Sequence, residues 1–185
     1  VLTGKVTNLW GKNKAKEIAL EQDSIEEVDN RIQVSGVKVD DERLAGRVQR
    51  RLANYVHYSV YDLVSAGVKN GTVLLDGYVT MPYKAEEMAK MESRIEGVQK
   101  VVNEIETLPT STQDQELRQE IARRIYGDTM FFEYSTQADP PIHILVRNGR
   151  VTLAGTVRSK VEKQKAEQIA RSTFGVMDVD NQLKV

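Results

Sequence analysis

The sequence predicts an α+β protein built from tandem copies of one small unit, with the element order helix, strand, strand, helix, strand (αββαβ). Each unit is expected to form a mixed three-stranded sheet with two helices packed on one face. Two observations lead to this prediction. The glycines and asparagines of the chain recur at fixed offsets. An Asn-Gly pair also separates two β-rich runs in each longer copy, which is the strongest short-range signal of a β-hairpin.

The internal repeat becomes visible when the chain is aligned on its glycines. Residues 73–79 match residues 151–157 at an offset of 78 positions (155 − 77), and residues 1–6 join the same register at an offset of 73 (77 − 4). Other pairs at 78 are Asn70 with Asn148, Gly71 with Gly149, Gly97 with Gly175, Val101 with Val179 and Asn103 with Asn181. In the first copy Ile25, Val28 and Asn30 fall on Val98, Val101 and Asn103, and Ser24 replaces the glycine. Matches this regular indicate a true repeat.

The elements of each unit follow from local patterns. Strands are expected on both sides of Asn70-Gly71 and of Asn148-Gly149, and short final strands at 101–106 and 179–185. Helices are expected where apolar residues recur at helical spacing. These stripes are Ala15, Ile18 and Ala19; Leu44, Val48 and Leu52; Met88, Met91 and Ile95; Leu117, Ile121 and Ile125; and Ala166, Ile169, Ala170 and Thr173. Gly97 and Gly175 are expected to be left-handed caps just past their helices.

Three segments are predicted along the chain: a partial unit at 1–35 and complete units at 36–109 and 110–185. The first copy begins at its second strand, so it should contain strand, helix, strand, and upstream sequence is expected to complete it. Residues 35–40 form the first expected junction. Residues 107–112 form a polar linker that contains a proline.

The composition excludes several classes of function. Lys and Arg number 26 against 27 Asp and Glu, so no global charge draws the chain to nucleic acid, and no nucleic-acid partner is predicted. The chain has no cysteine, which removes disulfides, thiolate metal sites and cysteine nucleophiles. No run is long and apolar enough to predict a transmembrane segment, and no signal peptide is recognised.

Candidate chemistry is sparse. His57 lies in an expected helix-exit loop and His143 in an expected strand among aliphatic residues, and neither joins a cluster of metal ligands. Asp40-Asp41-Glu42 is interpreted as favourable charge at a helix start. The Asn-Gly turns precede strands, so they do not resemble a phosphate loop. The sequence therefore predicts a non-enzymatic protein with no catalytic residue, no metal and no cofactor.

The joint spacing of these motifs carries a family resemblance. The residues are Asn70-Gly71-Thr72-Val73-Leu74-Leu75-Asp76-Gly77, Gly97-Val98 and 101–105 in the middle copy, and 141–155, Gly175-Val176 and 179–181 in the last. With them the chain resembles the BON-domain family, known from bacterial envelope proteins induced by osmotic stress. The resemblance implies an αββαβ fold, a secreted and usually periplasmic setting, and a role in binding phospholipid or attaching to the envelope. The incomplete first copy and Ser24 depart from the family pattern.

The first candidate binding feature is a basic ridge on the leading helix of the middle copy. It consists of Arg43, Arg47, Arg50 and Arg51, followed by Tyr55, His57 and Tyr58. Basic side chains beside amphipathic aromatics suit an anionic lipid surface. An ordinary solvated helix face is the alternative.

Two further features contain exposed-type aromatics. One is the strand-to-helix loop, with Leu9-Trp10 in the first copy and Met81-Pro82-Tyr83 in the second. It is expected either to mark an interface or to pack against a neighbouring unit. The other is Met130–Tyr134, with Phe131 and Phe132, in a long loop before Pro140-Pro141. It is expected either to plug the end of the core or to form a binding tip.

Two hypotheses from different classes follow. The first is a periplasmic binding module, related to osmotic or envelope stress, that contacts anionic phospholipid or an envelope protein through the basic ridge. The second is a self-associating scaffold that forms a homo-oligomer, because open sheet edges invite pairing and the first copy lacks its hairpin partner, as in domain swapping. A chaperone-like role is a third possibility that no sequence feature separates from these.

Overall fold

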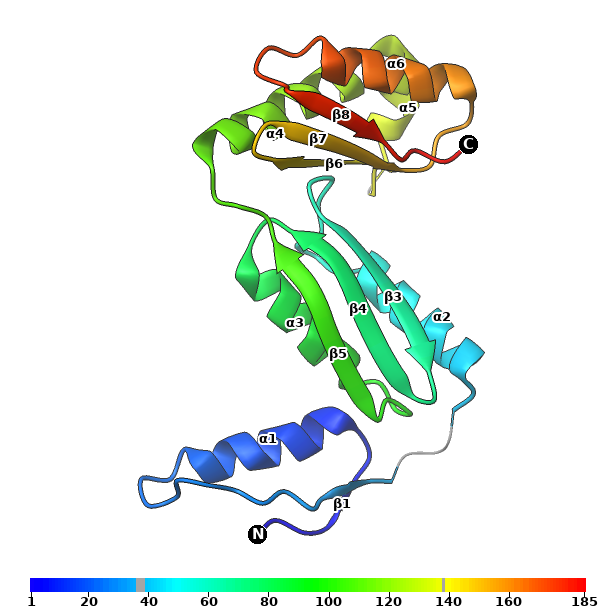
Figure 1. Cartoon of the computed structure of the whole chain (residues 1–185). Coiled ribbons are helices and arrows are strands. Elements are labelled where there is room, and N and C mark those ends of the chain that lie inside the picture. Colours follow the sequence, from blue (N-terminus) through cyan, green and yellow to red (C-terminus); the bar gives the residue numbers. More distant parts are fainter. Residues whose placement is uncertain (36–38, 138) are drawn as a thin grey trace. The chain divides into compact units, whose positions relative to one another are not determined.

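The computed structural model describes residues 1–35, 39–137 and 139–185 (Figure 1). Residues 36–38 of the expected junction lie outside the described residues. By their contacts the residues form two compact units. The first comprises Val1–Tyr55, Ser65–Asp76 and Ala85–Glu104, and the second Val56–Val64, Gly77–Lys84 and Ile105–Val185. The middle copy of the repeat therefore contributes residues to both units.

The first copy contains a strand, a helix and a strand. Strand β1 (Lys5–Val6) pairs in parallel with β2 (Gln33–Val34), and helix α1 (Leu9–Leu20) connects them. Asn8 caps the helix, because its side chain accepts a hydrogen bond from the Gly11 amide at 2.9 Å. The Asn30 side chain donates to the Lys12 carbonyl at 2.7 Å, which ties the segment leading to β2 to the helix.

The middle copy contains α2 (Asp41–Ala53), β3 (Leu63–Lys69), β4 (Thr72–Val79), α3 (Pro82–Glu92) and β5 (Lys100–Thr107). The strands form a sheet in the order β3-β4-β5, and both helices lie on the same face of it in Figure 1. Its buried side chains include Leu44, Val48, Leu52, Val73, Leu75 and Met88. The apolar stripe predicted for α2 is therefore its core face.

The last copy contains α4 (Thr112–Tyr126), the short helices η1 (Thr129–Phe131) and α5 (Phe132–Ser135), β6 (Ile142–Arg147), β7 (Arg150–Gly155), α6 (Lys160–Arg171) and β8 (Asp178–Asn181). Strands β6 and β7 are antiparallel, whereas β7 and β8 are parallel. The sheet is therefore mixed and three-stranded, as predicted. Fully buried Ile121, Ile125, Ile144, Leu153 and Ala166 belong to its core. The predicted α+β class is confirmed.

Two local expectations need correction. Met130–Tyr134, expected to lie in a loop, forms most of η1 and α5. Gly97 and Gly175 do not cap their helices, because α3 ends at Glu92 and α6 at Arg171. After each helix the chain continues through tight turns, in which the amide of residue i+3 donates to the carbonyl of residue i. Both glycines still need the left-handed backbone, with φ of 99° and 92°.

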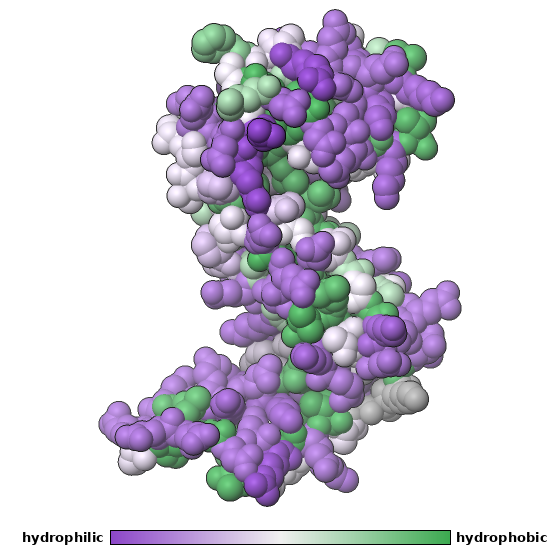
Figure 2. Space-filling model, viewed as in Figure 1, coloured by the Kyte–Doolittle hydropathy of each residue, from purple (hydrophilic) through white to green (hydrophobic). Residues whose placement is uncertain are grey.

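The surface is predominantly polar. In Figure 2 hydrophilic side chains cover most of the visible face, and apolar residues occur there in small separate groups. Scattered apolar residues of this kind are normal on a protein surface. The visible face therefore shows no single broad apolar patch.

Each complete copy closes its hairpin with the predicted Asn-Gly turn. Asn70-Gly71 has φ values of 51° and 71°, and Asn148-Gly149 has 52° and 74°, the positive values that a type I′ turn requires. An aspartate in the first turn of the preceding helix accepts both turn amides. Asp41 does so at 2.6 and 3.0 Å, and Asp114 at 2.8 Å for each. The acidic helix start thus clamps the hairpin, beyond its predicted interaction with the helix dipole.

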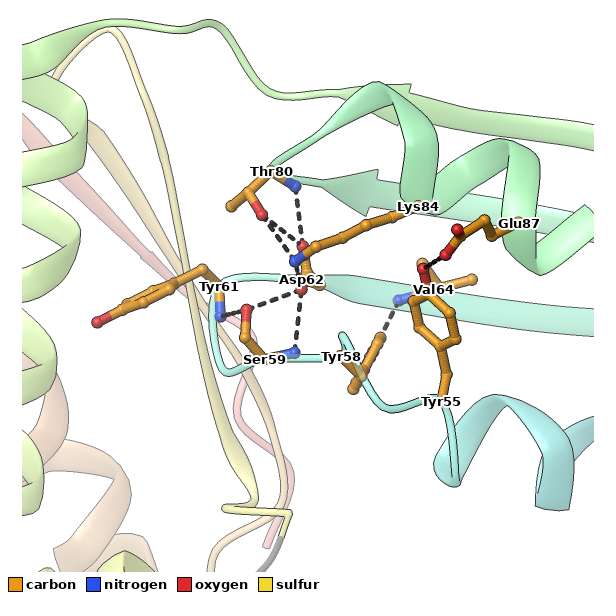
Figure 3. A network of polar contacts seen from close by, with 9 residues as sticks. All are labelled: Tyr55, Tyr58, Ser59, Tyr61, Asp62, Val64, Thr80, Lys84 and Glu87. Carbon is orange, nitrogen blue, oxygen red and sulfur yellow. Dashed lines mark hydrogen bonds and ion pairs between the residues drawn. The ribbon is translucent and has the colours of Figure 1, made fainter.

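A buried carboxylate in the second unit joins three segments of the middle copy. Asp62, fully buried, accepts hydrogen bonds from the amides and hydroxyls of Ser59 and Thr80 at 2.7–3.0 Å. It also pairs with the Lys84 ammonium at 2.6 Å (Figure 3). Because one anion satisfies so many donors, the start of β3, the end of β4 and the start of α3 are fixed together.

The same segment covers part of an open sheet edge. Strand β6 is an edge strand of its sheet, and the Ile144 amide donates to the Val60 carbonyl at 2.7 Å. Beside this bond, the rings of Tyr58 and His143 meet edge to face with centroids 5.6 Å apart. Covering an edge in this way limits unwanted strand pairing.

Removal of the Asp114 carboxylate should destabilise the last copy. In Asp114→Ala both amides of the Asn148-Gly149 turn lose their acceptors. The buried Gly149 amide is left unpaired at a cost of about 1–3 kcal/mol, and the part-buried Asn148 amide adds a smaller loss. We expect the free energy of unfolding, measured by urea denaturation, to fall by roughly 2–4 kcal/mol. Asp41→Ala should cost less, because Asp41 is less buried. A loss below about 0.5 kcal/mol for Asp114→Ala, the size of an ordinary surface change, would contradict this role.

Candidate functional site

A groove in the first unit is lined mainly by arginines. Its volume is about 600 Å³. The lining residues are Arg47, Arg50, Arg51, Asn54, Met91, Arg94, Ile95 and Glu96. We call it the basic groove, because four guanidinium groups and one carboxylate surround it. An anion is the ligand that such a charge balance favours.

The spacing of α2 directs three of these arginines into the basic groove. Its core face carries the buried Leu44–Val48–Leu52 stripe, so Arg47, Arg50 and Arg51, at three- and four-residue spacing, project from neighbouring faces. Arg50 and Arg51 also occupy the last turn, where the negative end of the helix dipole favours cations. Arg43, the fourth predicted residue, is exposed on the same helix but does not line the groove.

Arg94 was missed by sequence reasoning. It follows α3, and its guanidinium carbon lies 4.9 Å from the centre of the Trp10 ring, a cation–π distance. Trp10 is held in place because its backbone N–H donates to the Ser93 carbonyl at 2.9 Å. The first copy thus supplies an aromatic partner to an arginine of the groove.

A buried glutamate lies next to this arginine cluster. Glu92 is fully buried, and neither of its carboxyl oxygens has a hydrogen-bond partner among the described residues. Burial raises the pKa of Glu92 to about 7, and the Arg51 charge opposes that rise. Glu92 aligns with Ala19 and Ala170 in the other copies, and Ala170 is fully buried, so the fold itself does not require a carboxyl group there.

The corresponding region of the last copy has a different charge pattern. At the offset of 73 that aligns α2 with α4 (114 − 41), Glu116 and Glu120 replace Arg43 and Arg47. Arg124, the counterpart of Arg51, donates to the hydroxyls of Thr173 and Ser172 at 2.7 and 3.0 Å. The counterpart of Arg50 is Arg123, and a groove of the last copy is lined by Arg123, Arg124 and Lys165 together with Asp128. The two copies therefore differ in degree, because the groove of the middle copy has four arginines and that of the last copy has two arginines and a lysine.

The predicted tyrosines do not line the basic groove. The Tyr55 hydroxyl donates to Glu87 at 2.5 Å. The Tyr58 hydroxyl accepts from the Val64 amide at 3.0 Å, and burial raises the pKa of Tyr58 to about 12. Tyr83 is 46% exposed and meets the His57 ring edge to face at 5.9 Å. Tyr58 and Tyr83 belong to the second unit.

The two phenylalanines predicted as a binding tip lie in different environments. Phe131 is fully buried and stacks on Tyr134 with centroids 6.1 Å apart. The structure thus gives it the alternative role, packing in the core. Phe132 is 66% exposed. Only one of the pair is available to a ligand in this conformation.

The remaining candidate chemistry is limited. His143 packs in the sheet, and burial lowers its pKa. Within residues 1–35, 39–137 and 139–185, no group of three or more His, Cys, Asp or Glu residues is placed to hold a metal ion. In the same ranges, no helix has the length and apolar character needed to cross a membrane.

Comparison with known proteins identifies the family to which this repeat belongs. A sequence model of the BON domain matches residues 1–36, 40–109 and 113–185. The chain belongs to the BON domain family. It is 27% identical over 168 residues to osmotically-inducible protein Y of Escherichia coli (strain K12). The aligned region covers 86% of this chain and 79% of that protein. The predicted tandem BON repeat is therefore confirmed, while the division of the chain at residues 35 and 109 stays a prediction.

Solved structures offer a weaker comparison. Two structures of CdsD, a structural protein of the type III secretion system of Chlamydia trachomatis, are 15% identical to this chain and cover 98% of it. The matches span 81% and 77% of those chains, with a TM-score of 0.32 for each. A likeness at that level carries no argument about function.

Glu92 should make stability depend on pH. Its folded pKa, about 7, exceeds that of a glutamate in an unfolded chain, so between these values the folded state holds the proton more tightly. The contribution of Glu92 to stability is therefore fully present below about pH 4 and is lost as the pH rises to about 7, a loss of at most about 3 kcal/mol. Glu92→Gln should remove that fall. Urea denaturation at several pH values measures it, and an unchanged slope in the variant would refute the assignment.

Proposed function

We propose that this protein is a non-enzymatic periplasmic module that contacts anionic phospholipid through the basic groove. The carrying observation is that none of the groove arginines forms an ion pair with a carboxylate within the described part of the chain. Arg51 does interact electrostatically with the buried Glu92. No carboxylate lies within 4.0 Å of Arg43, Arg47, Arg50, Arg51 or Arg94 among the described residues. A cluster of unpaired guanidiniums raises the local potential and attracts phosphate groups.

Arginines elsewhere in the chain serve as a contrast. Arg123, Arg147, Arg158 and Arg171 form ion pairs with Glu120, Glu106, Glu133 and Glu167, respectively. Their charge is compensated locally, whereas that of the basic groove is left for a ligand. The groove also has apolar lining residues, Met91 and Ile95, and Trp10 stands beside Arg94. Apolar groups beside cations suit the boundary between lipid head groups and acyl chains.

The family supports the same setting. The Escherichia coli relative is named as an osmotically inducible protein, and we propose a related role in osmotic or envelope stress for this chain. Phospholipid at an envelope membrane supplies the anionic surface that the groove needs. The exposed Tyr83 and Phe132 are proposed as secondary contacts.

Neutralising the groove should weaken binding to anionic vesicles. We expect Arg47→Gln/Arg50→Gln/Arg94→Gln to reduce partitioning onto phosphatidylglycerol-containing vesicles by about a hundredfold, since each cation near a membrane contributes about 1 kcal/mol. Arg51 is kept, because its removal would leave Glu92 without its neighbouring charge. Flotation of the full chain with vesicles measures the effect.

A matched control separates the groove from net charge. Arg123→Gln/Arg150→Gln/Arg171→Gln removes the same charge from exposed positions of the last copy and should leave flotation nearly unchanged. Equal losses in the two triple variants would rule out a specific groove. Equal flotation with neutral and anionic vesicles would rule out the phosphate contact.

Self-association is a second candidate, favoured by one observation. Within the residues that the structure describes, strand β1 has β2 as its one neighbour in a two-stranded sheet, so its other edge offers backbone groups to a further strand. We expect light scattering over a concentration series to show a dimer. Lys5→Pro should shift it to monomer, because the backbone groups of Val6 face β2 and those of Lys5 face the open edge. A strict monomer at high concentration would exclude this candidate.

A further inference from the structure

A second pocket, in the second unit, is built around one buried arginine. Its volume is about 240 Å³. It is lined by Arg118, Gln115 and Gln119 of α4, by linker residues 109–112, and by Tyr61 and Met81. It shares no residue with the basic groove and does not depend on the phospholipid contact proposed above.

Arg118 is buried without a charged partner in contact. It is 6% exposed, and its Nε donates to the backbone carbonyl of Asp114 at 3.2 Å. In the described part of the chain no carboxylate lies within 4.0 Å of its nitrogens, and its two terminal nitrogens have no hydrogen-bond acceptor. Burial accordingly lowers the pKa of Arg118. Neither terminal nitrogen belongs to the fully buried unpaired atoms of the described residues, so both can be reached from the pocket that Arg118 lines. A ligand that accepts from both nitrogens would bind favourably.

The fold does not require an arginine at this position. At the offset of 73 that aligns α2 with α4, Arg118 corresponds to Ala45 (118 − 73). Ala45 is half-buried in a helix of the same repeat. Packing of the unit is therefore compatible with a methyl group, and the arginine is an addition particular to the last copy.

The pocket combines polar and apolar walls. Gln115 and Gln119 and the hydroxyl groups of the linker provide polar groups near Arg118, while Tyr61, Met81 and Pro109 provide apolar surface. Tyr61 is held because it packs against the core of the last copy, and Figure 3 shows its ring pointing away from the Asp62 network. A ligand with one charged end and one apolar end would satisfy both walls.

Neighbouring carboxylates limit the charge of that ligand. Asp62 and Asp114 both act electrostatically on Arg118. Asp62 is already paired with Lys84 at 2.6 Å, and Asp114 holds the Asn148-Gly149 turn. Both carboxylates repel any anion, and they repel a dianion about twice as strongly as a monoanion. A monoanion also balances the single positive charge of Arg118.

We infer that this pocket binds the carboxylate of a small apolar acid or of a peptide C-terminus, with the Arg118 guanidinium holding its two oxygens. The planar fork of an arginine matches a carboxylate in geometry. The apolar wall of Tyr61, Met81 and Pro109 would take the adjoining side chain.

Titration of the ¹⁵N-labelled full chain, followed by NMR, tests the inference. The probes are N-acetyl-leucine, its amide N-acetyl-leucinamide, the acid N-acetyl-alanyl-leucine and inorganic phosphate. We expect the acids to shift the Arg118 Nε–H signal and the signals of Gln115 and Gln119. The amide should bind about tenfold more weakly or not at all, since it lacks the charge. Tighter binding of the dipeptide than of the amino acid would identify a peptide C-terminus as the source, and the reverse a free acid.

Variants separate binding from folding. Arg118→Ala, which copies the residue of the middle repeat, should abolish the shifts, and Arg118→Lys should weaken them, because an ammonium keeps the charge and loses the fork. Arg123→Ala on the same helix, exposed and outside the pocket, should bind as the unaltered chain. If circular dichroism shows that Arg118→Ala is unfolded, Thr110→Trp decides, because it fills the pocket from an exposed position and leaves Arg118 in place.

Three results would overturn the inference. The first is no binding of any acid. The second is binding that persists in Arg118→Ala or, where that variant does not fold, in Thr110→Trp. The third is tighter binding of phosphate than of the carboxylates. None of these results bears on vesicle flotation by the basic groove.

Discussion

The hairpin turn clamped by an aspartate is the constraint on which each complete copy depends. An Asn-Gly turn sets the strand register, and in a strand a slip of one residue would move every side chain to the opposite face. Asp41 and Asp114 add a tertiary condition, since each accepts both turn amides from the first turn of a helix. The clamp therefore fixes the start of that helix relative to the hairpin.

The placement of the basic groove follows from that constraint. Once the hairpin holds the start of α2, its Leu44–Val48–Leu52 stripe is committed to the core, and the arginines between those positions must face outward. Their placement needs no strain, because the helix C-terminus favours cations. The same geometry in α4 commits Leu117, Ile121 and Ile125 to the core. The two complete copies thus share the same fold and core, and they differ in the side chains on their surfaces.

The sequence predicted the repeated αββαβ fold but only part of the two candidate sites. The turns, the apolar stripes and the repeat register are local or periodic signals, so the fold could be predicted from them. Three of the groove arginines followed from helical spacing. Arg94 could not be found in this way, because its role depends on a turn after α3 and on Trp10 from another copy. The pocket around Arg118 depends on loops that come together only in the folded chain.

The alignment of the copies did contain a signal for the residues that the sequence analysis had not singled out. It lies at the positions where the copies have different residue types. Glu92 stands where the other copies have alanine, and Arg118 where the middle copy has alanine. In a repeat, a position that serves only the shared fold should accept the residue type that another copy has there. A buried charge that replaces a small apolar residue raises the cost of folding, so the fold alone does not explain its presence.

The Asp62–Lys84 pair shows the contrasting case. The last copy has no such pair, and there Glu162 instead accepts from the Tyr134 hydroxyl at 2.7 Å and from the Arg158 amide at 2.8 Å. That exchange preserves a satisfied network. Among the described residues, the carboxyl oxygens of Glu92 and the terminal nitrogens of Arg118 have no hydrogen-bond partner. At such groups a proton or a ligand adds an interaction that the fold does not supply.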